Sequence, residues 1–258
     1  MTAVRRLFVL LCGFEVIPRT VSVRGSDPRV IHAVPITTYL LDTDEGWVLF
    51  DAALDEGNLR DPERLRSHFL ESGWDPPPVV GRDHEMEPQL KRIGIGWEDI
   101  GTVVVSHLHA DHSGHLKRMT HARIMIHRRE YDHAFSGRAN RAWFPDDYDM
   151  DFKWDVIDSD TVLMPGIEIL ETFGHTPGHV SLAVDLPETG PVVLAADVGD
   201  MMENFTEERL PGEASSDAEA LASIKRINGL VAERNALLML THDPDLLLGL
   251  KLAPDFYA

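Results

Sequence analysis

The sequence predicts an α/β fold in which two β-sheets pack face to face with helices on their outer sides, an αβ/βα four-layer sandwich. Three observations support this prediction. Short apolar runs typical of strands alternate with segments of helical spacing. These elements recur in two halves of the chain. The length of 258 residues suits one large core, so we expect residues 1–258 to form a single domain.

The first half of the chain is expected to supply one sheet and its covering helices. Its predicted strands are the runs at 4–17, 36–41, 47–50, 102–105 and 122–127. Its predicted helices are at 62–71, 88–93, 116–119 and 128–135. The basic pair Arg5-Arg6 and the apolar residues after it superficially resemble a secretory signal. The run is short and no small-residue cleavage site follows, so we interpret it as the first strand.

The second half is expected to supply the other sheet. Its predicted strands are at 156–163, 167–172, 180–184, 192–196 and 237–240. The string Ser216 to Glu219 matches a capping box and precedes apolar residues at helical spacing, which predicts a helix there. The stretches 136–154 and 201–215 lack periodicity and are expected to be loops.

The composition limits the classes of partner. The net charge is −19, with 43 acidic against 24 basic residues, which argues against binding a nucleic-acid backbone or an anionic membrane surface. No segment approaches the roughly 18 apolar residues that span a bilayer. The single cysteine, Cys12, excludes an internal disulfide and a cysteine-rich zinc site. We therefore expect a cytoplasmic protein.

The stretch Ser106 to Gly114 is the most informative part of the chain. It places three imidazoles and one carboxylate within six residues, directly after the apolar run 102–105. A tight loop after a buried strand can direct several side chains to one point. The natural arrangement is two metal ions side by side, with two ligands for each. The first ion would take His107 and His109, and the second would take Asp111 and His112.

Three further donors follow at the ends of later apolar runs. The string Gly174-His175-Thr176-Pro177-Gly178-His179 contains two histidines. Asp197 ends the run that begins at Val192, and His242 follows the run 237–240. All are nitrogen or oxygen donors, which suits zinc and also accommodates iron, manganese or cobalt.

Together these motifs resemble the signature of the metallo-β-lactamase superfamily, over nearly the whole chain. The resemblance implies the four-layer sandwich and a centre of two divalent metal ions, with Zn²⁺ expected. The implied ligands of one ion are His107, His109 and His179, and those of the other are Asp111, His112 and His242. Asp197 is implied to bridge both ions, and His175 is expected not to be a ligand.

The resemblance also implies a supporting residue and a mechanism. Asp51, which closes the run 47–50, is expected to brace a ligand histidine from beneath the site. A water acidified by the metals would attack a carbonyl, and Asp111 would pass the proton to the leaving group as the catalytic acid. The chain is most similar to the N-acyl homoserine lactonase branch, which implies a lactone hydrolase that acts in quorum quenching.

Two alternatives stay open at this point. One is a thioester hydrolase of the glyoxalase II kind, although the acidic C-terminal region lacks the basic glutathione site of that group. The other is a non-hydrolytic di-iron redox or metal-sensing module on the same fold. The partner is expected to be a small-molecule lactone, and the protein a monomer or homodimer.

The substrate pocket is expected to involve three residues. In many acyl-homoserine lactonases a tyrosine stands third after the bridging aspartate, and in this chain Asp200 takes that place. A carboxylate there should favour neutral lactones that carry a hydrogen-bond donor. Trp143 and Phe144, in the loop 136–154, are further candidates for the wall of the pocket.

Overall fold

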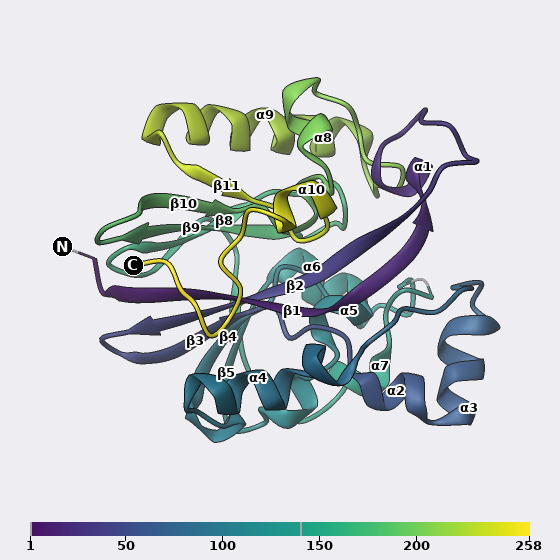
Figure 1. The fold of residues 1–258 in the computed structure, drawn as a ribbon, viewed down its shortest axis with the longest axis horizontal. Coiled ribbons are helices and arrows are strands. Elements are labelled where there is room, and N and C mark those ends of the chain that lie inside the picture. The colour runs from purple at the N-terminus through teal and green to yellow at the C-terminus, as the bar shows by residue number, and fades with distance from the viewer. Residues whose placement is uncertain (1, 140) are drawn as a thin grey trace.

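Two β-sheets lie face to face between helices in the computed structural model, which describes residues 2–139 and 141–258 (Figure 1). The expected four-layer αβ/βα sandwich is therefore observed. Helix α9 (Asp217–Arg234) covers the outer face of one sheet, and α4 (Met86–Ile93) lies on the outer side of the other. Among the described residues, no helix combines the length and apolar character required to cross a membrane.

The first sheet has six strands in the order β1-β2-β3-β4-β5-β6. They are β1 (Val4–Pro18), β2 (Ile31–Thr43), β3 (Gly46–Phe50), β4 (Ile100–Val104), β5 (Arg123–His127) and β6 (Lys153–Ile157). Strands β1 to β3 are antiparallel, whereas β3 to β6 run parallel. The first predicted strand, 4–17, which contains the basic pair, is thus an edge strand of this sheet.

The second sheet has five strands in the order β11-β10-β9-β8-β7. They are β7 (Thr161–Met164), β8 (Ile167–Glu171), β9 (Val180–Leu186), β10 (Gly190–Leu194) and β11 (Leu237–Met239). The single strand expected at 156–163 was wrong. Its beginning belongs to β6 in the first sheet and its end to β7 in the second. The chain passes from one sheet to the other between these strands. A single strand-like run of residues therefore pairs with β5 at its start and with β8 at its end.

Short helices and turns connect the strands. Besides α4 and α9, the α-helices are α1 (Arg19–Ser22), α2 (Glu56–Arg60), α3 (Pro62–Arg64), α5 (Ala110–Ser113), α6 (Arg128–Ala134), α7 (Pro145–Tyr148), α8 (Met202–Thr206) and α10 (Pro244–Leu247). A π-helix spans Leu65–Leu70, and 3₁₀ turns span Arg82–His84, Trp97–Asp99, Leu116–Arg118 and Ala196–Val198. Helices α7 and α8 lie within the stretches 136–154 and 201–215, which were expected to be loops. Four-residue and five-residue helices are too short to show periodicity.

Apolar side chains fill three layers. Alternate residues of β1 face opposite sides of the sheet, so Leu7 and Val9 lie between the sheets while Phe8 and Leu10 face the helices. The third layer joins the second sheet to α9. This helix begins at Ser216, whose hydroxyl accepts a hydrogen bond from the Glu219 N–H at 3.3 Å. The helix therefore starts where the sequence predicted, but only the serine half of the capping box forms, because the Glu219 carboxylate accepts from Arg129 instead.

The two sheets bring the ends of several strands to one edge. The loops that follow β3, β4, β8, β10 and β11 carry the residues from which the sequence predicted a metal site. Three residues here adopt the left-handed backbone conformation, with φ of 65° at Asp51, 49° at Ala53 and 47° at Ala196. Non-glycine residues rarely adopt this conformation, and such strain tends to concentrate at functional sites.

Candidate metal centre

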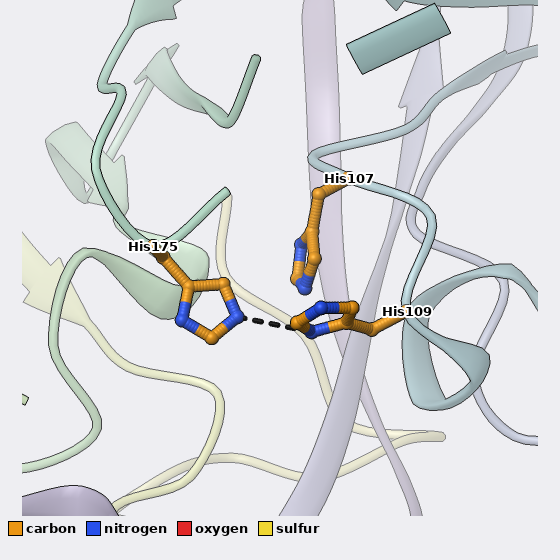
Figure 2. Close-up of side chains that lie close together, drawn as sticks. All are labelled: His107, His109 and His175. Carbon is orange, nitrogen blue, oxygen red and sulfur yellow. Dashed lines mark hydrogen bonds between the residues drawn. The ribbon is translucent and has the colours of Figure 1, made fainter. Parts of the chain in front are cut away.

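Three histidines from two different loops form one half of the centre. His107 and His109 follow β4 in the first sheet, and His175 follows β8 in the second. Figure 2 shows the three imidazoles pointing toward one another, with His175 Nε2 3.1 Å from His109 Nδ1. The ring of His107 is fully buried, and its centroid lies 4.4 Å from that of His109. The arrangement offers three nitrogen donors to a single ion.

The other half combines Asp111, His112 and His242, whose ligand atoms also lie close enough to share one ion. The Asp111 carboxylate lies 3.2 Å from Nε2 of His112 and 3.5 Å from Nε2 of His242. Asp111 and His112 are on α5, and His242 comes from the loop after β11. The sequence therefore placed these three residues together correctly.

Asp197 lies between the two halves. Its Oδ1 is 3.3 Å from Nε2 of His112 and 3.4 Å from Nε2 of His242. Its Oδ2 is 3.3 Å from Nε2 of His175 and 3.8 Å from Nε2 of His107. Each carboxylate oxygen thus faces a different half, as a bridging ligand requires.

The structure corrects the choice between the two histidines of the Gly-His-Thr-Pro-Gly-His string. His179, not His175, was expected to be a ligand, but both nitrogens of His179 are occupied. Its Nδ1 donates to the carbonyl oxygen of Thr172 at 3.0 Å, and its Nε2 accepts the backbone N–H of Asp197 at 3.0 Å. His179 directly precedes β9, whereas His175 stands at the loop apex. His179 therefore anchors the loop, and His175 takes the place beside His107 and His109.

Hydrogen bonds on Nδ1 orient several of the imidazoles. His112 Nδ1 donates to Asp51 Oδ2 at 2.8 Å, the contact that the sequence led us to expect for Asp51. The same carboxylate accepts the Ser106 hydroxyl at 2.8 Å, and Ser106 in turn accepts from His107 Nδ1 at 2.9 Å. His242 Nδ1 donates to a backbone carbonyl, that of Pro35, at 2.8 Å. Each of these contacts leaves Nε2 as the free lone pair, the usual form of a metal-bound histidine.

Unsatisfied buried atoms test whether metal ions fit here. At this centre, Nε2 of His107 and His112 and Oδ1 of Asp197 are buried, and none has a hydrogen-bond partner among the described residues. Buried polar atoms are normally satisfied, so three unsatisfied atoms of this kind close together fit a site that holds metal cations. The donor set of nitrogens and carboxylate oxygens suits divalent zinc, iron, manganese or cobalt.

Electrostatics support the same conclusion. Burial lowers the pKa of His107 and His109 well below the usual value, so both are neutral and able to coordinate. Burial alone would raise the pKa of Asp111, but the neighbouring His112 and His242 outweigh it and lower that pKa to about 2. The carboxylate is therefore an anion, the form in which it binds metal.

A pocket of about 300 Å³ opens onto this centre, and His109, Asp111, His175, Asp197 and His242 lie at its inner end. Residues 15–18 of β1 and residues 72–76 also line it. Asp200, which was expected to line the pocket, does so and is 8% exposed. The remaining charged lining residues are Glu15, Asp75, Arg141 and Glu213. Sequence patterns gave no signal for the lining residues of β1, because an edge strand faces solvent, protein and pocket along its length.

Trp143 and Phe144 do not line this pocket, which corrects a second prediction. Both are buried, with 7% and 3% of their surfaces exposed. Phe144 packs edge-on against Phe69, and Trp143 lies edge-on against His109 with 4.1 Å between centroids. Large aromatic side chains gain most from burial, so they lie beneath the surface while their neighbour Arg141 faces the pocket.

Comparison with known proteins agrees with the geometry. The family model for the metallo-β-lactamase superfamily matches residues 33–242. An N-acyl homoserine lactonase from a Bacillus species is 31% identical over 229 residues, which are 89% of this chain and 89% of that protein. The N-acyl homoserine lactonase AttM of Azorhizobium caulinodans is 29% identical over 235 residues, covering 88% of each protein.

Solved structures give the same result over the full length. A variant of AiiA from B. thuringiensis with N-decanoyl-L-homoserine bound at the active site has a TM-score of 0.89 and 26% identity, and the match covers 100% of both chains. An N-acyl homoserine lactone hydrolase with the product N-hexanoyl-L-homoserine at its catalytic metal centre has a TM-score of 0.86, 26% identity and the same coverage.

Proposed function

Because this chain belongs to the metallo-β-lactamase superfamily, we propose that it is a metal-dependent lactonase that opens the ester ring of N-acyl homoserine lactones, in the manner of a quorum-quenching enzyme. The observation that carries the proposal is the cluster of buried, unsatisfied ligand atoms at the inner end of an open pocket. Similarity to N-acyl homoserine lactonases along most of the chain supports the substrate class.

The centre holds two divalent ions in this proposal. His107, His109 and His175 would hold one ion and Asp111, His112 and His242 the second, with Asp197 placed between the two sets. Zinc is the metal we favour, since imidazole and carboxylate donors suit zinc. When bound, such ions lower the pKa of a water toward neutral and polarise an ester carbonyl.

The residues of the chain perform the remaining work. Attack on the ester carbonyl breaks the ring C–O bond, and the departing alkoxide needs a proton to leave as the hydroxyl of an acyl homoserine. Asp111 lines the pocket and ends beside both His112 and His242. It is therefore placed to take the proton from the attacking water and deliver it to the leaving oxygen. The buried histidines keep these groups in fixed positions and cost no reorganisation during the reaction.

Asp200 determines substrate preference in this proposal. Burial raises the pKa of Asp200 to about 6, so the side chain is ionised at pH 7 and above. An ionised carboxylate accepts hydrogen bonds and cannot donate them. Lactones that carry an amide N–H or a hydroxyl should therefore bind well, and anionic lactones should bind poorly. Acyl homoserine lactones supply the amide N–H.

The remaining properties are also proposals. We infer that residues 1–258 form one domain, which is supported by the apolar layer shared between the two sheets. We expect the protein to act in the cytoplasm as a monomer or homodimer. Size-exclusion chromatography with light scattering measures the oligomeric state directly.

A hydrolysis screen with metal analysis of the same protein batch tests the proposed function. Acid release should be measured by titration on N-acyl homoserine lactones of several chain lengths, on simple γ-lactones and on thioesters. We expect close to two metal ions per chain and turnover of the acyl homoserine lactones. Turnover confined to thioesters would instead assign a thioesterase of the glyoxalase II kind. Two iron atoms with no turnover of any ester would assign a redox or sensing module.

A further inference from the structure

Glu130 is a fully buried carboxylate beside the three-histidine half of the centre. It lies on α6, directly after β5, and the proposed mechanism does not use it. Nothing in the sequence distinguished it from the other charged residues of that helix. Burying a carboxylate is costly unless hydrogen bonds compensate it, so its partners indicate what it does.

Four donors surround this carboxylate. Glu130 Oε1 accepts the backbone N–H of Leu108 at 3.0 Å and the indole N–H of Trp143 at 3.3 Å. Oε2 accepts the hydroxyl of Thr176 at 2.6 Å and the backbone N–H of Gly178 at 3.3 Å. Every one of these partners donates, so both oxygens of the Glu130 side chain act as acceptors.

These partners lie next to the three histidines. Leu108 stands between His107 and His109, and Thr176 directly follows His175. The two loops belong to different sheets, so the carboxylate joins the ligands of one sheet to the ligand of the other. The backbone of Gly178 packs directly against the backbone of Glu130. A Cβ atom at position 178 would lie 2.0 Å from the Glu130 nitrogen, so only glycine fits there.

The other half of the centre is held differently. His112 is fixed by Asp51 and His242 by the Pro35 carbonyl, through hydrogen bonds to the imidazoles themselves. For His109 and His175, the described part of the chain provides no such acceptor outside the centre. Their nearest polar contacts are each other and the shared Asp197. Their positions therefore depend on the loops that carry them, and on the Trp143 ring that lies against His109.

We propose that Glu130 is a positioning residue that fixes the spacing of the His107–His109 loop and the His175 loop, and thereby sets the metal affinity of the three-histidine half alone. This inference rests on the proposed dinuclear centre. It gives the three-histidine half a support of its own, whereas Asp51 orients His112 directly and His107 through the Ser106 hydroxyl. Partners outside the ligand set typically change metal affinity by about 10–100-fold when they are removed.

Glu130→Gln is the primary variant because it keeps the shape and removes the second acceptor. If the amide nitrogen faces the Oε1 side, it opposes two N–H donors. If it faces the Oε2 side, the Thr176 hydroxyl can rotate to accept, but the Gly178 N–H cannot. Either orientation leaves at least one buried N–H opposed by another donor. Thr176→Val is the milder second variant, since it removes a single donor and leaves the carboxylate in place.

Asp147→Asn is the matched control. Asp147 is also a fully buried carboxylate, but its side chain accepts from Lys117 Nζ at 2.6 Å and from Asn58 Nδ2 at 3.2 Å. Within the described parts of the chain, its carboxylate makes no hydrogen bond to the loops of the three histidines. The Asp147→Asn variant therefore measures the effect of weakening a buried carboxylate network elsewhere in the same layer.

The experiment is a titration of metal-free protein with Co²⁺, followed by visible absorbance and by competition with a chelator. Wild-type protein should bind two ions. Glu130→Gln should bind one ion with unchanged affinity and the second about 10–100-fold more weakly, and Thr176→Val should weaken the same ion by about 10-fold. Asp147→Asn should lower the unfolding midpoint of the metal-free protein and leave both affinities unchanged.

The possible outcomes separate this inference from the proposed function. Two ions bound by Glu130→Gln with wild-type affinity would overturn the role of Glu130 and leave the dinuclear centre intact. Equal weakening of both ions, or the same loss in Asp147→Asn, would also overturn it, because the effect would then be general destabilisation. Wild-type protein that binds fewer than two ions would overturn the dinuclear proposal itself. If Glu130→Gln fails to fold, Thr176→Val decides the question alone.

Discussion

Substitution of His175 should remove metal and leave stability almost unchanged, whereas substitution of His179 should lower the stability of the metal-free protein. The two histidines are four residues apart in the same loop, and the structure assigns one to the metal centre and the other to the loop itself. Replacing each with alanine therefore separates loss of metal from loss of stability. This comparison also tests the revision of the ligand set directly.

For His179→Ala, the structure predicts a large loss of stability. The imidazole is fully buried, accepts the Asp197 N–H and donates to the Thr172 carbonyl. Leaving these two buried groups without partners costs about 1–3 kcal/mol each, and the cavity adds to that cost. A total of roughly 2–6 kcal/mol is a large part of the roughly 5–15 kcal/mol that holds a typical domain folded. Urea unfolding of the metal-free variant should show it.

For His175→Ala, the structure predicts loss of metal with little change in stability. The side chain lines the pocket and is 13% exposed, and none of the described backbone groups bonds to its nitrogens. Metal-free protein should lose about 1 kcal/mol or less, as is usual away from buried networks. Metal content should fall from two ions toward one. Activity should fall by more than the roughly 10–100-fold that loss of a mere supporting residue causes.

Elemental analysis and urea unfolding of the same preparations measure both quantities. The reasoning would be refuted if His175→Ala retained two ions while His179→Ala lost one without loss of stability in the metal-free state. That result would restore the original expectation that His179 is the ligand.

Three further changes have defined outcomes. Asp111→Asn should lower kcat by about 10²–10⁴-fold, the range for loss of an acid–base group, and steady-state kinetics would reveal a smaller role if kcat were preserved. Asp200→Ala should change KM and the ranking of lactones by about 1–3 kcal/mol in kcat/KM. Unchanged kcat/KM on every lactone would make Asp200 a bystander. Burial raises the pKa of Asp42, but hydrogen bonds from Arg5 and Arg6 outweigh it and lower that pKa below its usual value. Asp42→Asn should therefore cost about 1 kcal/mol at pH 7, since both arginines are partly exposed, and the difference from wild type should shrink as the pH falls below about 4. If the difference in urea midpoint between Asp42→Asn and wild type persisted at pH 2–3, the predicted direction of the pH dependence would be wrong.

Most of the fold could be predicted because its elements have strong local patterns. The long apolar strand at the start of the chain, the run 102–105 and the capped helix after Ser216 all lie where expected. The prediction failed where one stretch of sequence serves two sheets, at β6 and β7. Period-two alternation reports that a residue is in a strand, and it contains no information about the partner strand.

The candidate site, too, was predicted where local spacing was sufficient and missed where contacts between distant residues decide. Spacing within the His107–His112 loop was informative because all four donors belong to one short segment after one strand. The choice between His175 and His179 could not be made locally, since both follow a glycine in the same string. It depends on which imidazole nitrogen remains free after the loop has packed, and that is settled by the Asp197 N–H from a different strand end.

The sequence by itself determined the order and type of most elements, the superfamily resemblance and six of the seven residues that meet at the centre. Tertiary structure alone decided that His175 joins them, that Glu130 connects their loops, and that Trp143 and Phe144 are buried while residues 15–18 and Arg141 line the pocket. The physical reason is the separation along the chain over which each effect acts. Propensity and periodicity act between near neighbours in the chain, whereas the free lone pair of a histidine and the exposure of an aromatic ring depend on contacts between residues that are tens of positions apart.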